Sequence, residues 1–203
     1  MHLVLCPFSQ TVGSSRMTTT GRKGAKARKV LVAFIGNKDR GDDAVGAITA
    51  GILTGRLPSD VELLVRDGDV LSLIDDWAGF DAVICVDAAA PMGVPGRIHR
   101  FNLTTAELPS EMAFVSGHTF GLAATVRLAR TLQLAPQDII VYAVEGRCFD
   151  NGAPMTAEVV AALSKLARHI VTDVGRLRRR PQCHVGGAMP GVVTEKLNPC
   201  SPK

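Results

Sequence analysis

The chain has 203 residues, of which 46% are hydrophobic, and a formal net charge of +4. This length suffices for one domain with a sizeable core. The charge is unevenly divided, because residues 30–174 hold 11 Lys/Arg and 18 Asp/Glu, a net charge of −7, whereas the two ends hold 12 Lys/Arg and one acid, a net charge of +11. An acidic central part argues against a basic face that would bind nucleic acid.

The two ends differ in composition from the centre. Residues 1–29 are rich in Ser, Thr, Gly and basic residues, and residues 175–203 in Arg, Pro and Gly. Neither end shows apolar periodicity, so we expect a disordered leader at 1–29, one domain at 30–174 and a disordered basic tail at 175–203.

The cysteines and the apolar runs suggest a cellular compartment. Five cysteines with no C-x-x-C pair argue against a disulfide framework and fit a reducing cytoplasm. The start of the chain lacks a basic region and a cleavage signal, and no apolar run is long enough to span a membrane. We therefore expect a cytoplasmic protein with no membrane partner, and the acidic centre suits a monomer.

Apolar runs typical of strands alternate with helical patterns along the chain. In chain order, the expected strands are 30–35, 61–66, 81–86, 97–103 and 138–144, and the expected helices are 43–53, 70–77, 119–132 and 156–174. This alternation predicts the α/β class: a single three-layer domain with a mainly parallel twisted sheet, helices on both faces and an antiparallel edge strand.

Polar residues follow the ends of the three most apolar strands. Asn37, Asp87 and Glu145 stand at these positions, and His118 precedes the helix expected at 119–132. The carboxyl ends of parallel strands meet at one edge of a sheet, where ligands bind. We therefore expect the four loops to line one cleft.

The adjacent acids Asp42 and Asp43 stand at the start of the first helix and must point in different directions. One interpretation makes one of them an N-cap and leaves the other solvated near the positive end of the helix dipole. The functional interpretation keeps Asp42 as the cap and turns Asp43 into the cleft. Asp87 is less easily explained as a turn residue, because burial of a lone carboxylate is costly.

Two carboxylates and one imidazole, from Asp43, Asp87 and His118, would suit a borderline divalent ion such as nickel or zinc and leave positions open for another ligand. A carboxylate dyad of Asp43 and Asp87 is an alternative. A satisfied loop histidine is the bland interpretation of His118. No G-x-S-x-G is present, and neither G-x-G-x-x-G nor a P-loop occurs, so serine hydrolase or nucleotide chemistry is disfavoured.

Four motifs in this order resemble the hydrogenase maturation endopeptidases, which trim the large subunit of nickel-iron hydrogenases. The motifs are Phe34-Ile-Gly-Asn-Lys-Asp-Arg-Gly-Asp-Asp-Ala-Val-Gly46, Val83-Ile-Cys-Val-Asp87, Ser116-Gly-His118 and Tyr142-Ala-Val-Glu-Gly146. The chain departs from the family at Phe34 and Ala44, where the family has glycine. The resemblance spans about residues 30–174 and implies that Asp43, Asp87 and His118 are the metal-binding and catalytic residues.

The resemblance further implies an aspartyl-type endopeptidase that removes the C-terminal extension of a nickel-iron hydrogenase large-subunit precursor after nickel insertion. The nickel is expected to arrive with the precursor and not to be a resident cofactor. Cleavage then uses either the metal as a Lewis acid or an aspartate as a general base. Two alternatives remain: a nickel-binding chaperone or other non-cleaving homologue, and a related peptidase with a different substrate, such as small spore proteins.

Overall fold

A five-stranded sheet is the centre of the computed structural model, which describes residues 28–104 and 121–181. The strands lie in the order β2-β1-β3-β5-β4, and all pairs are parallel except that β4 runs antiparallel to β5. Their bounds are Val30–Ile35 (β1), Val61–Arg66 (β2), Ala82–Ala89 (β3), Ile98–Asn102 (β4) and Asp138–Glu145 (β5). The predicted parallel sheet with an antiparallel edge strand is confirmed.

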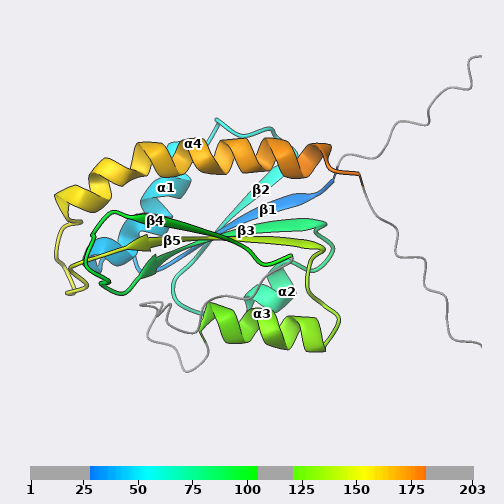
Figure 1. The fold of residues 1–203 in the computed structure, drawn as a ribbon, viewed down its shortest axis with the longest axis horizontal. Coiled ribbons are helices and arrows are strands. Elements are labelled where there is room, and N and C mark those ends of the chain that lie inside the picture. The colour runs from blue at the N-terminus through cyan, green and yellow to red at the C-terminus, as the bar shows by residue number, and fades with distance from the viewer. Residues whose placement is uncertain (1–27, 105–120, 182–203) are drawn as a thin grey trace, which may run out of the picture.

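Helices cover both faces of this sheet (Figure 1). Their bounds are Val45–Leu53 (α1), Leu73–Asp76 (α2), Leu122–Thr131 (α3) and Ala157–Arg179 (α4). Val32 and Phe34 of β1 pack in the core shared with α1 and α4, whereas Leu31 and Ala33 face the core shared with α2 and α3. The three central strands β1, β3 and β5 are buried along their whole length because both faces are covered. The predicted three-layer domain is therefore confirmed.

Two of the predicted helices begin later than expected. The first is preceded by a 3-10 turn, Gly41–Ala44 (η1), so that α1 starts at Val45 and not at Asp43. The second shrinks from 70–77 to the single turn of α2, where Asp69 accepts a hydrogen bond from the backbone N–H of Ser72. The N-terminal limit predicted for the third helix, Thr119, lies outside the described residues.

The last helix is longer than predicted. It continues to Arg179, five residues past the boundary expected at 174, so the loss of order predicted from Gly175 is wrong for residues 175–179. Val174 and Leu177 are spaced by one helical turn and both are buried in the core. Three arginines in the last turn also suit the negative end of the helix dipole. No helix in the described ranges is long and apolar enough to cross a membrane.

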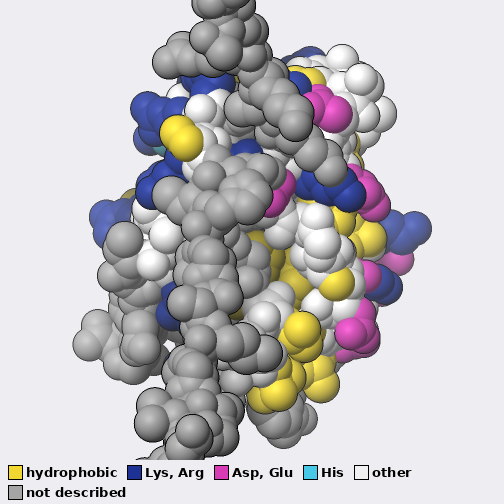
Figure 2. Space-filling view, turned by 90° about the vertical axis from the view of Figure 1, so that its right-hand side faces the viewer, with side chains coloured by type: hydrophobic (Ala, Val, Ile, Leu, Met, Phe, Trp, Pro, Cys, Tyr) yellow, Lys and Arg dark blue, Asp and Glu magenta, His cyan; other side chains and the backbone are white. Residues whose placement is uncertain are grey.

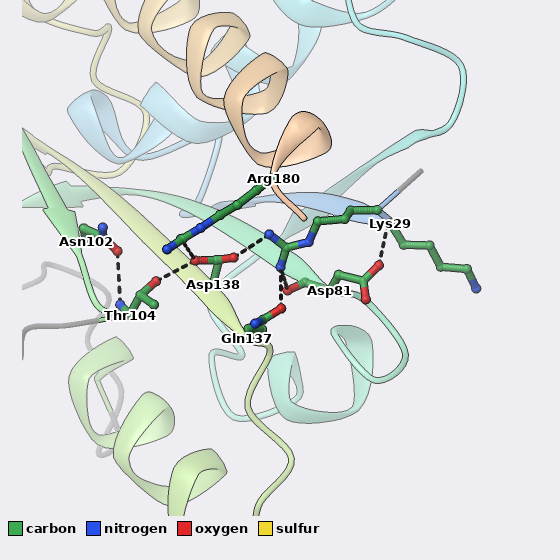
Figure 3. Close-up of polar contacts among 8 residues, drawn as sticks. Lys29, Asp81, Asn102, Thr104, Gln137, Asp138 and Arg180 are labelled. Carbon is green, nitrogen blue, oxygen red and sulfur yellow. Dashed lines mark hydrogen bonds and ion pairs between the residues drawn. The ribbon is translucent and has the colours of Figure 1, made fainter. Parts of the chain in front are cut away.

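Both ends of the described chain meet at the edge of the sheet where the parallel strands begin, and a network of polar contacts holds them there (Figure 3). Arg28 is fully buried and donates to Asp138 at 2.6 Å, and Arg180 pairs with the second oxygen of the same carboxylate. Thr104 Oγ1 also donates to that second oxygen, at 3.0 Å. Because Arg28 is buried and bonded, the predicted disordered leader is wrong for its last two residues, 28 and 29.

Figure 2 looks onto the side of the molecule where the two ends of the described chain emerge. Lys and Arg side chains and Asp and Glu side chains both appear on this face, and hydrophobic side chains gather in the lower half of the view. The opposite side, at the left of Figure 1, carries the carboxyl ends of β1, β3 and β5 and the start of α4. This second edge is the one at which the sequence places its candidate site.

Candidate active site

Asp87 lies inside β3 and not after its end. The strand runs on to Ala89, and Asp87 pairs in register with Ala143 of β5. The predicted strand end at Val86 is therefore wrong, because Ala88 and Ala89 continue the ladder by pairing with Val144 and Glu145 of β5. Asp87 nevertheless sits near the carboxyl end of the parallel strands, as predicted.

The Asp87 carboxylate is fully buried and its Oδ1 accepts the backbone N–H of Ala88 at 2.8 Å. Side chains alternate along a strand, so Asp87 shares the sheet face of Cys85, on the side of α2 and α3. Burial, with a smaller contribution from the Asp87 charge, raises the pKa of the Cys85 thiol to about 12. Cys85 is thus a protonated core residue, and it is not the nucleophile of a cysteine peptidase.

Asp43 is a buried carboxylate with one unused oxygen. Its Oδ2 accepts the backbone N–H of Asn37 at 3.1 Å and lies 3.9 Å from a guanidinium nitrogen of Arg40. Its Oδ1 is buried and has no hydrogen-bond partner in the described structure. Orphaned buried oxygens are rare and point to a missing partner such as a ligand or an ion. The donor chemistry at Asp43 therefore fits a divalent cation.

The close approach of Asp43 to the end of β1 depends on Gly36. Gly36 has φ of +122°, and a Cβ atom there would lie 2.3 Å from the Asp43 carbonyl oxygen and 2.9 Å from its Oδ1. Only glycine accepts this conformation without strain and leaves room for the carboxylate. Since β1 is hydrogen-bonded to β3, Asp43 and Asp87 come from neighbouring strand ends at one edge of the sheet.

Asp42 has a different task from the one predicted. It does not cap its own helix, since neither η1 nor α1 has a side-chain cap. Its two oxygens accept the backbone N–H groups of Arg147, Cys148 and Thr156 at 2.7–3.0 Å, and also the Thr156 hydroxyl. Burial raises the pKa of Asp42, but these hydrogen bonds outweigh it and hold the pKa below its ordinary value. Asp42 joins η1 to the segment between β5 and α4.

His118 lies outside the described residues, as does Ser116. Of the three predicted site residues, the structure describes Asp43 and Asp87, and both lie at this edge of the sheet. Within residues 28–104 and 121–181, no group of three or more His, Cys, Asp or Glu side chains is arranged to hold a metal ion. The sharing of a metal by Asp43, Asp87 and His118 therefore stays a prediction.

A buried acid and a histidine at the same edge were missed as a pair. Glu145, the last residue of β5, is fully buried, and its Oε2 lies 3.9 Å from His99 Nε2 of β4. Neither atom has a hydrogen-bond partner in the described part of the chain. Glu145 was expected at this edge because it follows an apolar run, whereas His99 carries no spacing that would reveal it as the neighbour of Glu145.

The family of the chain follows from a comparison with known families. The family model for hydrogenase maturation protease matches residues 61–173, which is more than half of the chain. The chain belongs to the hydrogenase maturation protease family. The prediction of an endopeptidase that serves hydrogenase maturation is thereby confirmed.

Solved structures of family members share the fold. The maturating endopeptidase HybD from E. coli is 22% identical over 73% of this chain and 93% of its own, with a TM-score of 0.61. HybD from Thermococcus kodakarensis is 21% identical over 72% and 99%, with a TM-score of 0.59, and HycI from the same organism is 21% identical over 74% and 94%, with a TM-score of 0.56. At these identities the likeness shows the fold. No curated protein matches the chain.

Proposed function

We propose that this endopeptidase removes the C-terminal extension of a nickel-iron hydrogenase large-subunit precursor after nickel insertion, and that it recognises the precursor's nickel with Asp43, Asp87 and His118. The observation that carries the proposal is the unpartnered, buried Oδ1 of Asp43, which lies at the sheet edge that also holds Asp87. A carboxylate with a vacant oxygen accepts a metal ion without first losing a hydrogen bond.

A metal carried by the substrate explains why the buried Asp43 carboxylate has a hydrogen-bond partner on only one of its two oxygens. An unpaired buried carboxylate oxygen costs free energy until it is engaged. A nickel-loaded precursor supplies the cation that engages it, whereas a nickel-free precursor leaves that cost in place. The enzyme therefore gains affinity only for the loaded precursor, which makes nickel a signal that the precursor is ready for cleavage.

Two routes to peptide cleavage are compatible with these side chains. The substrate's nickel can polarise the scissile carbonyl as a Lewis acid, with the aspartates as ligands. Alternatively an aspartate accepts a proton from the attacking water. Asp43 Oδ1 is available for that proton, whereas Asp87 Oδ1 already accepts the N–H of Ala88. Both routes require recognition of the loaded precursor, which we assign to Asp43, Asp87 and His118. We propose that the enzyme acts in the cytoplasm and that it is a monomer.

Mass spectrometry of the precursor C-terminus tests the proposal. Purified enzyme should shorten nickel-loaded precursor and leave nickel-free precursor intact, and Asp87→Asn or His118→Ala should stop cleavage. Cleavage of both precursors at equal rates would reject nickel recognition. Nickel-dependent binding with no change in mass would instead favour a chaperone or other non-cleaving homologue, and cleavage of another protein alone would favour a peptidase with a different substrate.

A further inference from the structure

The loop between β3 and β4, residues 90–97, begins three residues after Asp87 at the carboxyl edge of the sheet, where Figure 1 shows it at the left. Gly93 and Gly96 have φ of +107° and +80°. A Cβ atom on Gly96 would lie 2.4 Å from the carbonyl oxygen of Glu158 in the first turn of α4, so the loop packs closely on that helix. The loop is thus part of the same edge as the candidate site.

Glu145 fixes the backbone of this loop through hydrogen bonds. Its Oε1 accepts the backbone N–H of Met92 at 2.6 Å and of Val94 at 2.5 Å, and its own carbonyl oxygen accepts the N–H of Gly96 at 2.7 Å. Hydrogen bonds to a buried carboxylate are stronger than those between neutral groups. Three bonds to one residue therefore fix the backbone of a segment that has no regular structure of its own.

The fixed backbone presents apolar side chains to solvent. Pro91 is exposed, and Met92 and Val94 are each 43% exposed, although their N–H groups point inward to Glu145. Three exposed apolar side chains within four residues of one another offer apolar surface to a ligand. Arg97, at the end of the loop, is its only charged residue.

We propose that Glu145 is a positioning residue for peptide cleavage, which fixes residues 90–97 as a wall of the substrate cleft where Pro91, Met92 and Val94 bind an apolar stretch of the precursor. This inference rests on the proposed function for the identity of the substrate. An endopeptidase must hold an extended polypeptide next to its reacting groups, and this surface lies directly beyond the strand that carries Asp87. Its apolar character selects an apolar segment of that polypeptide over a charged one.

The register of the sheet places this wall next to the candidate site. Asp87 of β3, Ala143 of β5 and His99 of β4 are paired across three neighbouring strands, and Ala89 pairs with Glu145 one step closer to the loop. The small side chains of Ala89 and Ala143 separate Asp87 from Glu145 and His99. The loop held by Glu145 therefore lies at the same end of β3 as Asp87, and its Pro91 follows Ala89, the last residue of that strand, by two positions in the chain.

The surface is tested with Met92→Ser/Val94→Ser, which changes only exposed side chains. Val160→Ser/Val171→Ser on α4 is the matched control, because these valines are 50% and 42% exposed. The first variant should raise KM for the nickel-loaded precursor about tenfold, with kcat and Tm unchanged, and the control should match wild type. A KM equal to that of the control, or a loss confined to kcat, would overturn the proposal.

The positioning role of Glu145 is tested with two variants that differ in their ability to accept the loop's hydrogen bonds. Glu145→Gln keeps an acceptor oxygen and should stay within about threefold of the wild-type KM, whereas Glu145→Ala should raise KM about tenfold at temperatures where it remains folded. Equal KM values for the two variants would refute the positioning role.

Peptide binding separates this inference from the proposed function. Wild-type enzyme is titrated with ten-residue peptides that contain one large apolar residue and with all-polar peptides of the same length. Preference for the apolar peptides that is lost in Met92→Ser/Val94→Ser supports the inference even if precursor cleavage proves independent of nickel. Absence of that preference in wild type contradicts it, whatever happens to the precursor.

Discussion

The two edges of the sheet treat buried carboxylates in opposite ways. At the edge where the parallel strands begin, both oxygens of Asp138 are bonded, to Arg28 on one side and to Thr104 and Arg180 on the other. At the opposite edge, Asp43 Oδ1 and Glu145 Oε2 are buried without a hydrogen-bond partner within the described ranges. Fully paired buried acids secure a fold, whereas under-paired ones mark a place where something else must bind.

The same contrast holds between two neighbouring residues. Asp42 satisfies both of its oxygens with donors from the segment before α4, and Asp43 satisfies one. Their carboxylates are equally buried, so burial alone does not distinguish a structural acid from a functional one. The number of hydrogen-bond donors around each carboxylate oxygen does distinguish them. Mutations at the paired acids should therefore reduce stability, and mutations at Asp43 should reduce activity.

The largest loss of stability is expected for Arg28→Met. Breaking a buried ion pair leaves the Asp138 charge partly uncompensated, and we expect a loss of about 3 kcal/mol in the free energy of unfolding, measured by urea denaturation. Arg178→Met, which breaks the exposed pair with Asp60, is the control and should change stability far less. Equal losses in the two variants would show that the network at this edge has no special role.

A smaller loss is expected when the chain ends at Gly175. This truncation removes buried Leu177 and the Arg180 partner of Asp138, and should cost about 2 kcal/mol in the free energy of unfolding. A chain of residues 28–181 keeps both and should match the full-length protein in stability and cleavage. The domain bounds expected from the sequence, 30–174, are thus widened to 28–181; a destabilised 28–181 chain would contradict this limit.

Asp42 should make stability depend on pH. Its pKa in the folded protein lies below the ordinary value of 3.8, so its stabilising effect is fully present above that value and is lost as the pH falls through the folded pKa. Asp42→Asn should cost about 1 kcal/mol at pH 7 and flatten the fall in stability between about pH 4 and pH 2. Urea denaturation at several pH values measures both. An unchanged acid limb in the variant would rule out this role.

The smallest change in stability is expected for Asp43→Asn. The amide keeps an acceptor for the N–H of Asn37 and removes a buried charge whose other oxygen is unpartnered, so the free energy of unfolding should stay within about 1 kcal/mol of wild type. Thermal and urea denaturation measure this. A loss as large as that of Arg28→Met would place Asp43 among the structural acids.

Hydrophobic periodicity was sufficient to predict the layers and the order of strands and helices. The runs at 30–35 and 138–144 are buried on both faces. In a chain that alternates strands with helices, such runs indicate central parallel strands. Boundaries were harder to predict, because Ala88 and Ala89 extend β3 by sheet pairing, and Leu177 extends α4 by core contacts, neither of which is visible locally.

The sequence predicted the sheet edge at which Asp43 and Asp87 lie, but not the contacts of Asp42 and Glu145. Asp87 and Asp43 lie at the predicted edge because strand order brings their loops together. The task of Asp42 depends on donors more than 100 residues away in sequence, at Arg147 and Thr156. The contact between His99 and Glu145 likewise needs the antiparallel pairing of β4 with β5. Such long-range contacts cannot be read from spacing.

Cleavage of nickel-loaded precursor by Asp43→Asn tests the central claim most directly, with Asp39→Asn as the control because Asp39 is exposed in the same loop. Mass spectrometry of the precursor C-terminus gives the rate. The expected result is a loss of about a thousandfold for Asp43→Asn, at unchanged stability, and wild-type cleavage for Asp39→Asn. Cleavage by Asp43→Asn at the wild-type rate would contradict the claim that the unpartnered carboxylate oxygen at this edge is there for the substrate.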